Sequence, residues 1–98
     1  MIFDGNNHAV FMLHDHLIIC VKYRKPIIDD NISGDLQKIF EQICPHYKIR
    51  LEEWNHDRDH VHILFRANPD SELSRFIGTY KSASSRRMKK EYGNNKSL

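Results

Sequence analysis

Residues 49–66 read IRLEEWNHDRDHVHILFR, and this stretch decides the fold that we predict from the sequence. Apolar and polar side chains alternate over residues 49–54 and again over residues 60–66, as in strands with one buried face. The residues between them, 55–59, are polar and suit a short turn. The two strands are therefore expected to form an antiparallel hairpin.

The second of these strands divides its side chains between two faces. Because side chains alternate along a strand, one face is apolar and the other is mixed. The apolar face carries Val61, Ile63 and Phe65, and the mixed face carries His60, His62 and Leu64. We expect the apolar face to pack under helices, which leaves two imidazoles side by side on the open face.

A helix is expected on each side of the hairpin. The helix before it begins after a capping residue, which is Asp29, Asp30 or Asn31, and ends at Cys44-Pro45. Its apolar stripe, spaced i, i+3, i+4 and i+7, consists of Leu36, Ile39, Phe40 and Ile43. The helix after the hairpin starts near Glu72 and extends to about Tyr92. Its stripe consists of Leu73, Phe76, Ile77 and Tyr80.

A further apolar run, residues 10–23, precedes the first helix and predicts a strand. It forms either one strand or two pieces around His14-Asp15-His16, and it ends before Pro26. The order is then β-α-β-β-α, an α+β, ferredoxin-like arrangement with an antiparallel sheet and helices on one face. The fourth strand that usually completes such a unit is not evident, and we expect residues 1–98 to form a single domain.

The composition is that of a globular protein. The chain has 98 residues, of which 40% are hydrophobic and 29% charged, which excludes low complexity and disorder. The longest apolar stretch, Leu17 to Val21, is far shorter than the ~20 residues of a membrane span, and the N-terminus has no signal-peptide pattern. We therefore expect a cytoplasmic protein with no membrane partner. Cys20 and Cys44 fit reduced thiols, with one disulfide between them as the alternative.

Positive charge gathers at the C-terminal end. Residues 75–98 hold seven Lys and Arg against Glu91 alone, a net +6, whereas residues 1–74 carry −4. Such an asymmetry fits either a solvated helix face or a surface that binds a polyanion.

His60 and His62 are the residues on which metal chemistry can be built. Neighbours on one face of a strand are about 6.5–7 Å apart, so both rings can converge on one divalent ion. The alternative is a pair of surface histidines, and His14 and His16 have the same spacing. Two histidines are also too few for a catalytic metal, which takes three protein ligands or oxygens of the substrate.

Three separated segments resemble motifs of one enzyme family. Residues 57–64, DRDHVHIL, resemble the His-hydrophobic-His motif of the single-tyrosine HUH transposases of small insertion sequences, the IS200-like TnpA family. Residues 16–26, HLIICVKYRKP, resemble its first strand with a Lys-Tyr-Arg ending. Residues 76–86, FIGTYKSASSR, resemble its helix with a Lys-Gly-x-Ser-Ser-Arg pattern, although Ser82 replaces the glycine. The matches keep the family's order and cover most of the chain.

The resemblance implies DNA transposition. In the family, a tyrosine attacks single-stranded DNA and forms a 5′-phosphotyrosine, and the resemblance makes His60 and His62 two of three ligands of Mg²⁺ or Mn²⁺. The family's nucleophile and third ligand lie on a later helix, so we expect an N-terminal portion of the family domain that has no catalytic tyrosine. The tyrosines of this chain are expected to be packing residues, with Tyr92 the first to test as a nucleophile: Tyr23, Tyr47, Tyr80 and Tyr92.

The expected partners are single-stranded or hairpin DNA and a second copy of the chain, since family members join their sheets in homodimers. Cations that can contact phosphates are Lys22, Arg24, Lys25, Lys81, Arg86, Arg87, Lys89 and Lys90. Two alternatives remain open at this point. One is a DNA-binding remnant without catalysis, and the other is an RNA-binding module, which the missing aromatic pattern on the central strands disfavours.

Overall fold

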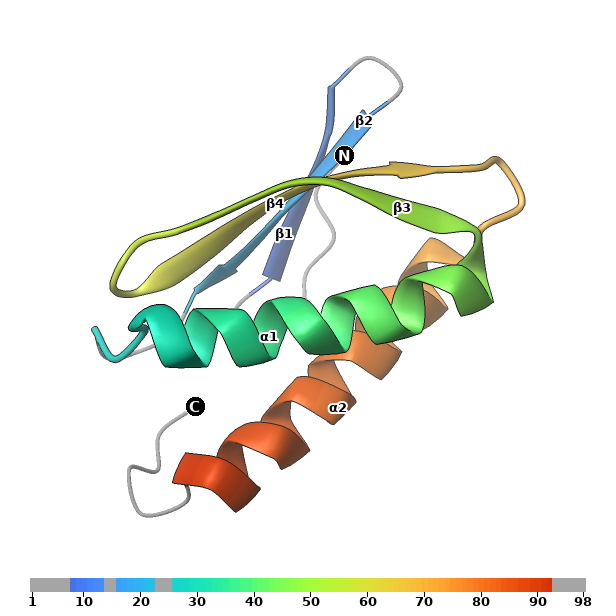
Figure 1. The fold of residues 1–98 in the computed structure, drawn as a ribbon. Coiled ribbons are helices and arrows are strands. Elements are labelled where there is room, and N and C mark those ends of the chain that lie inside the picture. Colours follow the sequence, from blue (N-terminus) through green and yellow to red (C-terminus); the bar gives the residue numbers. More distant parts are fainter. Residues whose placement is uncertain (1–7, 14–15, 23–25, 93–98) are drawn as a thin grey trace.

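The computed structural model describes residues 8–13, 16–22 and 26–92, with four strands, two long helices and one short 3₁₀ turn (Figure 1). The α+β class is confirmed. Both helices lie on the same side of the sheet, as expected (Figure 1). The elements are β1 (His8–Leu13), β2 (His16–Lys22), α1 (Asp30–Ile43), η1 (Cys44–Tyr47), β3 (Ile49–His56), β4 (His60–Ala67) and α2 (Leu73–Tyr92).

The sheet is antiparallel throughout, with strand order β1-β2-β4-β3. The predicted hairpin is present as β3 and β4, joined by residues 57–59. The fourth strand exists after all, because the apolar run from residue 10 forms two strands that pair with each other. The residues between those two strands, His14 and Asp15, lie outside the described part of the chain. The sheet is therefore completed at its N-terminal end, where the sequence left open whether residues 10–23 form one strand or two pieces.

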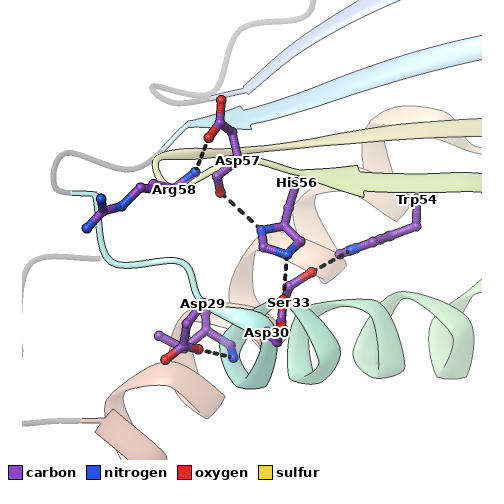
Figure 2. Close-up of polar contacts among 8 residues, drawn as sticks. Asp29, Asp30, Ser33, Trp54, His56, Asp57 and Arg58 are labelled. Atoms are coloured by element: carbon purple, nitrogen blue, oxygen red, sulfur yellow. Dashed lines mark hydrogen bonds and ion pairs between the residues drawn. The ribbon is translucent and has the colours of Figure 1, made fainter.

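A β-bulge interrupts β3. Leu51 pairs with Phe65 and Glu53 pairs with the next residue, Leu64, so Glu52 is the extra residue. The bulge places Trp54 on the helix side of the sheet, where its indole Nε1 donates to the Ser33 hydroxyl at 2.9 Å (Figure 2). The prediction of plain alternation over residues 49–54 missed this bulge. Trp54 is a packing residue, since its ring meets Phe40 edge to face.

The core lies between the sheet and the helices, and Phe40 of α1 is at its centre. Its ring makes edge-to-face contacts with four others, at centroid distances of 5.1 Å to Phe76, 5.3 Å to Tyr80, 5.7 Å to Phe65 and 6.0 Å to Trp54. Such pairs each add about 0.5–1.5 kcal/mol beyond the burial of their surface. The Tyr80 hydroxyl donates to the Leu36 carbonyl at 3.0 Å, which ties α2 to α1.

Helix α1 begins at a well-formed cap. Of the three predicted capping residues, Asp29 takes the role, and its carboxylate accepts from the Ile32 amide at 2.9 Å (Figure 2). The helix then passes into η1, which is followed by its capping residue Lys48 with a left-handed φ of 57°. Cys20 and Cys44 are free thiols, as expected, and burial raises the pKa of Cys44 to about 12.

Neither α1 nor α2, in the part of the chain that the structure describes, is both long and apolar enough to cross a membrane.

Candidate metal centre and the open face of the sheet

The face of the sheet opposite the helices, which we call the open face, is laid out in cross-strand rows. His60 of β4 faces Lys22 of β2, and one row further His62 lies between Cys20 and Asn55. In the next row Leu64 lies between Ile18 and Glu53. In the last row Arg66 faces Arg50 of β3, and its guanidinium is 3.2 Å from the ring of His16 on the other side.

The two histidines predicted from the sequence do come together. The centroids of the His60 and His62 rings are 4.7 Å apart and the rings meet at 84°. This distance is shorter than the about 6.5–7 Å between alternate residues of a strand, so the rings lean toward each other. His62 is exposed and the His60 side chain is 28% exposed. Both rings are therefore accessible from solvent at one point of the open face.

Asp59 orients His60. Its carboxylate Oδ1 is 2.8 Å from the His60 Nδ1, and this hydrogen bond is the main reason why the pKa of Asp59 is lowered. An ionised carboxylate only accepts, so the Nδ1–H of His60 donates. In the neutral ring the Nε2 lone pair is then free for a metal ion, which is the usual arrangement of histidine ligands.

The sequence predicts that Asp59 lies in the turn between the two strands. It does lie there, and its carboxylate also reaches the imidazole of His60. Asp59 precedes the first residue of β4, so the alternation of strand faces does not constrain its side chain.

The imidazoles of His60 and His62 suit a divalent ion whose remaining ligands are supplied by other groups. Within the described ranges, no three His, Cys, Asp or Glu side chains are arranged to hold a metal ion. Cys20 is the register partner of His62, yet burial raises its thiol pKa, against a smaller opposite effect of Lys22. A neutral thiol is a poor ligand. His60 and His62 therefore fit two positions of Mg²⁺ or Mn²⁺, with oxygens completing the shell.

A shallow groove adjoins the histidines on the open face. It has a volume of about 230 Å³ and it lies over β2, β4 and β3. Its lining residues are Ile18, Glu53, Asn55, His62, Ile63 and Leu64. Because the Ile63 side chain is fully buried, only the backbone of that residue can contribute to the lining.

The predicted phosphate-contacting cations are divided between two surfaces. Lys22 is exposed beside His60, at the end of β2, whereas Arg24 and Lys25 lie outside the described residues. The others are on α2, on the helical side of the sheet. Arg87 is 3.8 Å from Asp35 of α1. Of these predicted cations, Lys81 is half-buried, and Arg86, Arg87, Lys89 and Lys90 are exposed.

Two of the four tyrosines have packing roles, as predicted. Tyr80 is buried in the core, and Tyr47 is half-buried with its hydroxyl 3.0 Å from that of Thr79. Tyr23 and the side chain of Tyr92 lie outside what the structure describes. Asp59 and Arg66 also belong to the open face, which the sequence did not predict. Only the position of Asp59 next to His60 hinted at its contact.

Comparison with known proteins gives consistent matches. A profile of the transposase family described as IS200-like matches residues 9–98. The ISDra2 transposase TnpA of Deinococcus radiodurans is 34% identical over 79 residues, which are 81% of this chain and 56% of that protein. The transposase for insertion sequence element IS200 of Salmonella typhimurium is 26% identical over 78 residues, 80% of this chain and 51% of that protein.

A solved structure agrees in fold. The crystal structure of a candidate transposase from Deinococcus radiodurans R1 superposes with a TM-score of 0.66 at 30% identity, covering 81% of this chain and 61% of the other. The chain thus spans about half the length of the curated relatives that it matches.

Proposed function

Since this chain belongs to the IS200-like transposase family, we propose that it takes part in DNA transposition by supplying the metal site and the DNA-binding surface with which the complete family enzyme cleaves single-stranded DNA. The observation that carries the proposal is the geometry at the start of β4. Two imidazoles converge there on one side of the sheet, and a carboxylate holds the first of them with its Nε2 directed away from Asp59.

His60 and His62 are proposed to hold Mg²⁺ or Mn²⁺, which would polarise the scissile phosphate and stabilise the leaving oxygen. Asp59 fixes the tautomer of His60. Lys22, the register partner of His60, adds positive charge where the phosphate would lie. Tyr47 and Tyr80 are engaged in packing and are not the nucleophile. Within this chain, Tyr92 is the first tyrosine to test for formation of a 5′-phosphotyrosine.

The cations of α2 are proposed to bind the DNA away from the cleavage point. Arg86, Lys89 and Lys90 are spaced i, i+3 and i+4, so they lie on neighbouring positions of one helix surface, and all three are exposed. Helix α2, which carries them, lies on the helical side of the sheet (Figure 1), whereas the histidines are on the open face. A hairpin held by α2 and a single strand led to His60 and His62 would use both surfaces.

A second copy of the chain is proposed to join the sheet at β1. This edge strand carries no Lys, Arg, Asp or Glu, and Met12 on it is 58% exposed. The opposite edge, β3, is protected by its bulge and by charged residues such as Arg50 and Glu52. Because unprotected edges invite pairing, a homodimer would form through β1. Light scattering should give twice the monomer mass.

The test of the proposed function uses hairpin DNA with a single-stranded flank. The protein should bind it with a steep salt dependence, and any cleavage of the flank, with Tyr92 as the first nucleophile to test, should require Mn²⁺ or Mg²⁺. The variant His62→Ala should bind the hairpin as the wild type does and leave the flank intact. Failure of the wild type to bind this DNA at any salt concentration would overturn the proposal.

A DNA-binding protein without catalysis is the second candidate. It is favoured by the lack of a third metal ligand among the described residues. In that case the hairpin is bound with the same salt dependence, and no cleavage or covalent tyrosyl-DNA adduct forms with either metal.

A further inference from the structure

The groove beside His62 has the make-up of a pocket for one flat, partly polar ring. Its floor is apolar, because Ile18 and Leu64 are register partners on neighbouring strands and both are half-buried. Its wall on the β3 side is polar, formed by Glu53 and Asn55. Such a mixture of apolar surface with a few convergent polar groups is typical of small-ligand sites.

The polar groups on that wall are available to a ligand. Glu53 is the register partner of Leu64, and Asn55 is the register partner of His62. Both residues are exposed. Neither side chain makes a hydrogen bond or an ion pair with any other described residue. The groove therefore presents a free carboxylate and a free amide close to His62.

Two arginines lie one row beyond the groove. Arg50 and Arg66 are directly opposite each other in the β3–β4 register, an arrangement of like charges that is unfavourable in itself. Arg50 is 80% exposed and has Glu52 at 3.6 Å, whereas Arg66 contacts the His16 ring and no carboxylate among the described residues. A phosphate placed between the two guanidiniums would relieve their repulsion.

The three features lie in line along β4. From His62 through Leu64 to Arg66 the strand advances about 14 Å. A DNA strand with one phosphate at the histidines would pass over the groove and reach the arginine pair with a later phosphate. Phosphates would then lie at both ends of the groove and a base would lie over its middle.

We propose that this groove binds one unpaired nucleobase of single-stranded DNA next to the phosphate at His60 and His62. The base would lie on Ile18 and Leu64, while Glu53 and Asn55 contact its hydrogen-bonding edge and Arg50 and Arg66 hold a neighbouring phosphate. Because an ionised carboxylate only accepts hydrogen bonds, Glu53 favours bases with an exocyclic amino group. Thymine lacks that group and is disfavoured. This inference rests on the proposed function.

The test measures binding of single-stranded oligonucleotides of equal length, dA, dC and dT, by fluorescence anisotropy. EDTA is present, so the result does not depend on a metal ion. The wild type should bind dA and dC about fivefold or more tightly than dT, the range of a single good base contact. In Glu53→Gln the preference should fall to within about twofold, because a side-chain amide can also donate to thymine.

Glu41→Gln is the matched control, since it removes the same charge from an exposed position of α1 on the helical side. It should keep the full base preference. Arg66→Gln should weaken the binding of all three oligonucleotides by the same factor. It should also reduce the number of counterions released on binding, measured from the salt dependence of the affinity, by about one. Methyl NMR of the wild type should show shifts at Ile18 and Leu64 when dA is added.

The outcomes separate this inference from the function on which it rests. Binding of all three oligonucleotides with equal affinity, or a preference that survives in Glu53→Gln, would overturn the base pocket and leave the proposed function standing. Methyl shifts that are confined to residues of α2 would likewise overturn the base pocket and leave the proposed function standing. If no oligonucleotide binds to the wild type, the proposed function fails together with the pocket.

Discussion

The two faces of β4 make opposite uses of one strand. On the helix side, Val61, Ile63 and Phe65 have no exposed surface, while the open face carries His60 and His62. Because successive residues point to opposite faces, each exposed imidazole is anchored between buried neighbours. The buried residues of β4 therefore hold the site residues in position. Substitutions on the buried face should reduce stability, whereas substitutions on the open face should reduce binding.

The largest effect is expected from the core face. Phe65→Ala removes a fully buried ring that packs on Phe40 and Phe76, and should lower the free energy of unfolding by about 3–5 kcal/mol. That is a large part of the ~5–15 kcal/mol typical of a domain. Urea unfolding measures it. His62→Ala should stay within about 0.5 kcal/mol of the wild type, and a similar loss in both variants would contradict the division of faces.

The next effect concerns the metal ion. His60→Ala and His62→Ala should each weaken Mn²⁺ binding by about 100-fold or more. This loss is larger than the one expected when only a hydrogen-bonding partner of a metal ligand is removed. Calorimetry measures the affinity. His46→Ala, an exposed histidine of η1, is the control and should bind Mn²⁺ as the wild type does. Unchanged affinity in both β4 variants would exclude the site.

Asp59→Asn should have a smaller effect of the same kind. The amide keeps the size of the side chain but no longer supplies a charged acceptor to the His60 Nδ1, so Mn²⁺ affinity should fall by about 10–100-fold. The same calorimetric measurement applies, with Asp57→Asn as the control from the same turn. A loss as large as that of His60→Ala would mean that Asp59 binds the metal directly.

The smallest effects are expected on the helical side. Lys89→Gln or Lys90→Gln should each reduce the salt slope of hairpin binding by about one ion and weaken the complex only a few-fold at moderate salt. Mn²⁺ affinity should not change in either variant. If the metal affinity fell as well, the two surfaces would be coupled rather than independent.

Much of this arrangement follows from sequence periodicity. The alternation in residues 60–66 predicted which side of β4 is buried, and the 3.6-residue spacing of Leu36, Ile39 and Phe40 predicted the face of α1. His60 and His62 were identified because residues two apart on a strand share a face. These features depend only on local geometry, which a sequence records directly.

The features that the sequence did not reveal depend on pairing between strands. The split of residues 10–23 into β1 and β2 was left open, because the run is apolar on both sides of its polar triplet. Arg50 and Arg66 face each other only through the register of the hairpin. The contact of Asp59 with His60 depends on a turn conformation that no spacing rule specifies.

The bulge in β3 has a consequence for how this strand tolerates changes in length. Without Glu52, the rest of the strand alternates perfectly, with Leu51 and Trp54 toward the helices and Glu53 and Asn55 toward the open face. The sheet therefore accommodates Glu52 as one extra residue while both faces keep their other side chains. Deleting Glu52 is one of the few length changes within a strand that this fold should survive, and the product would be a straighter hairpin with the same site.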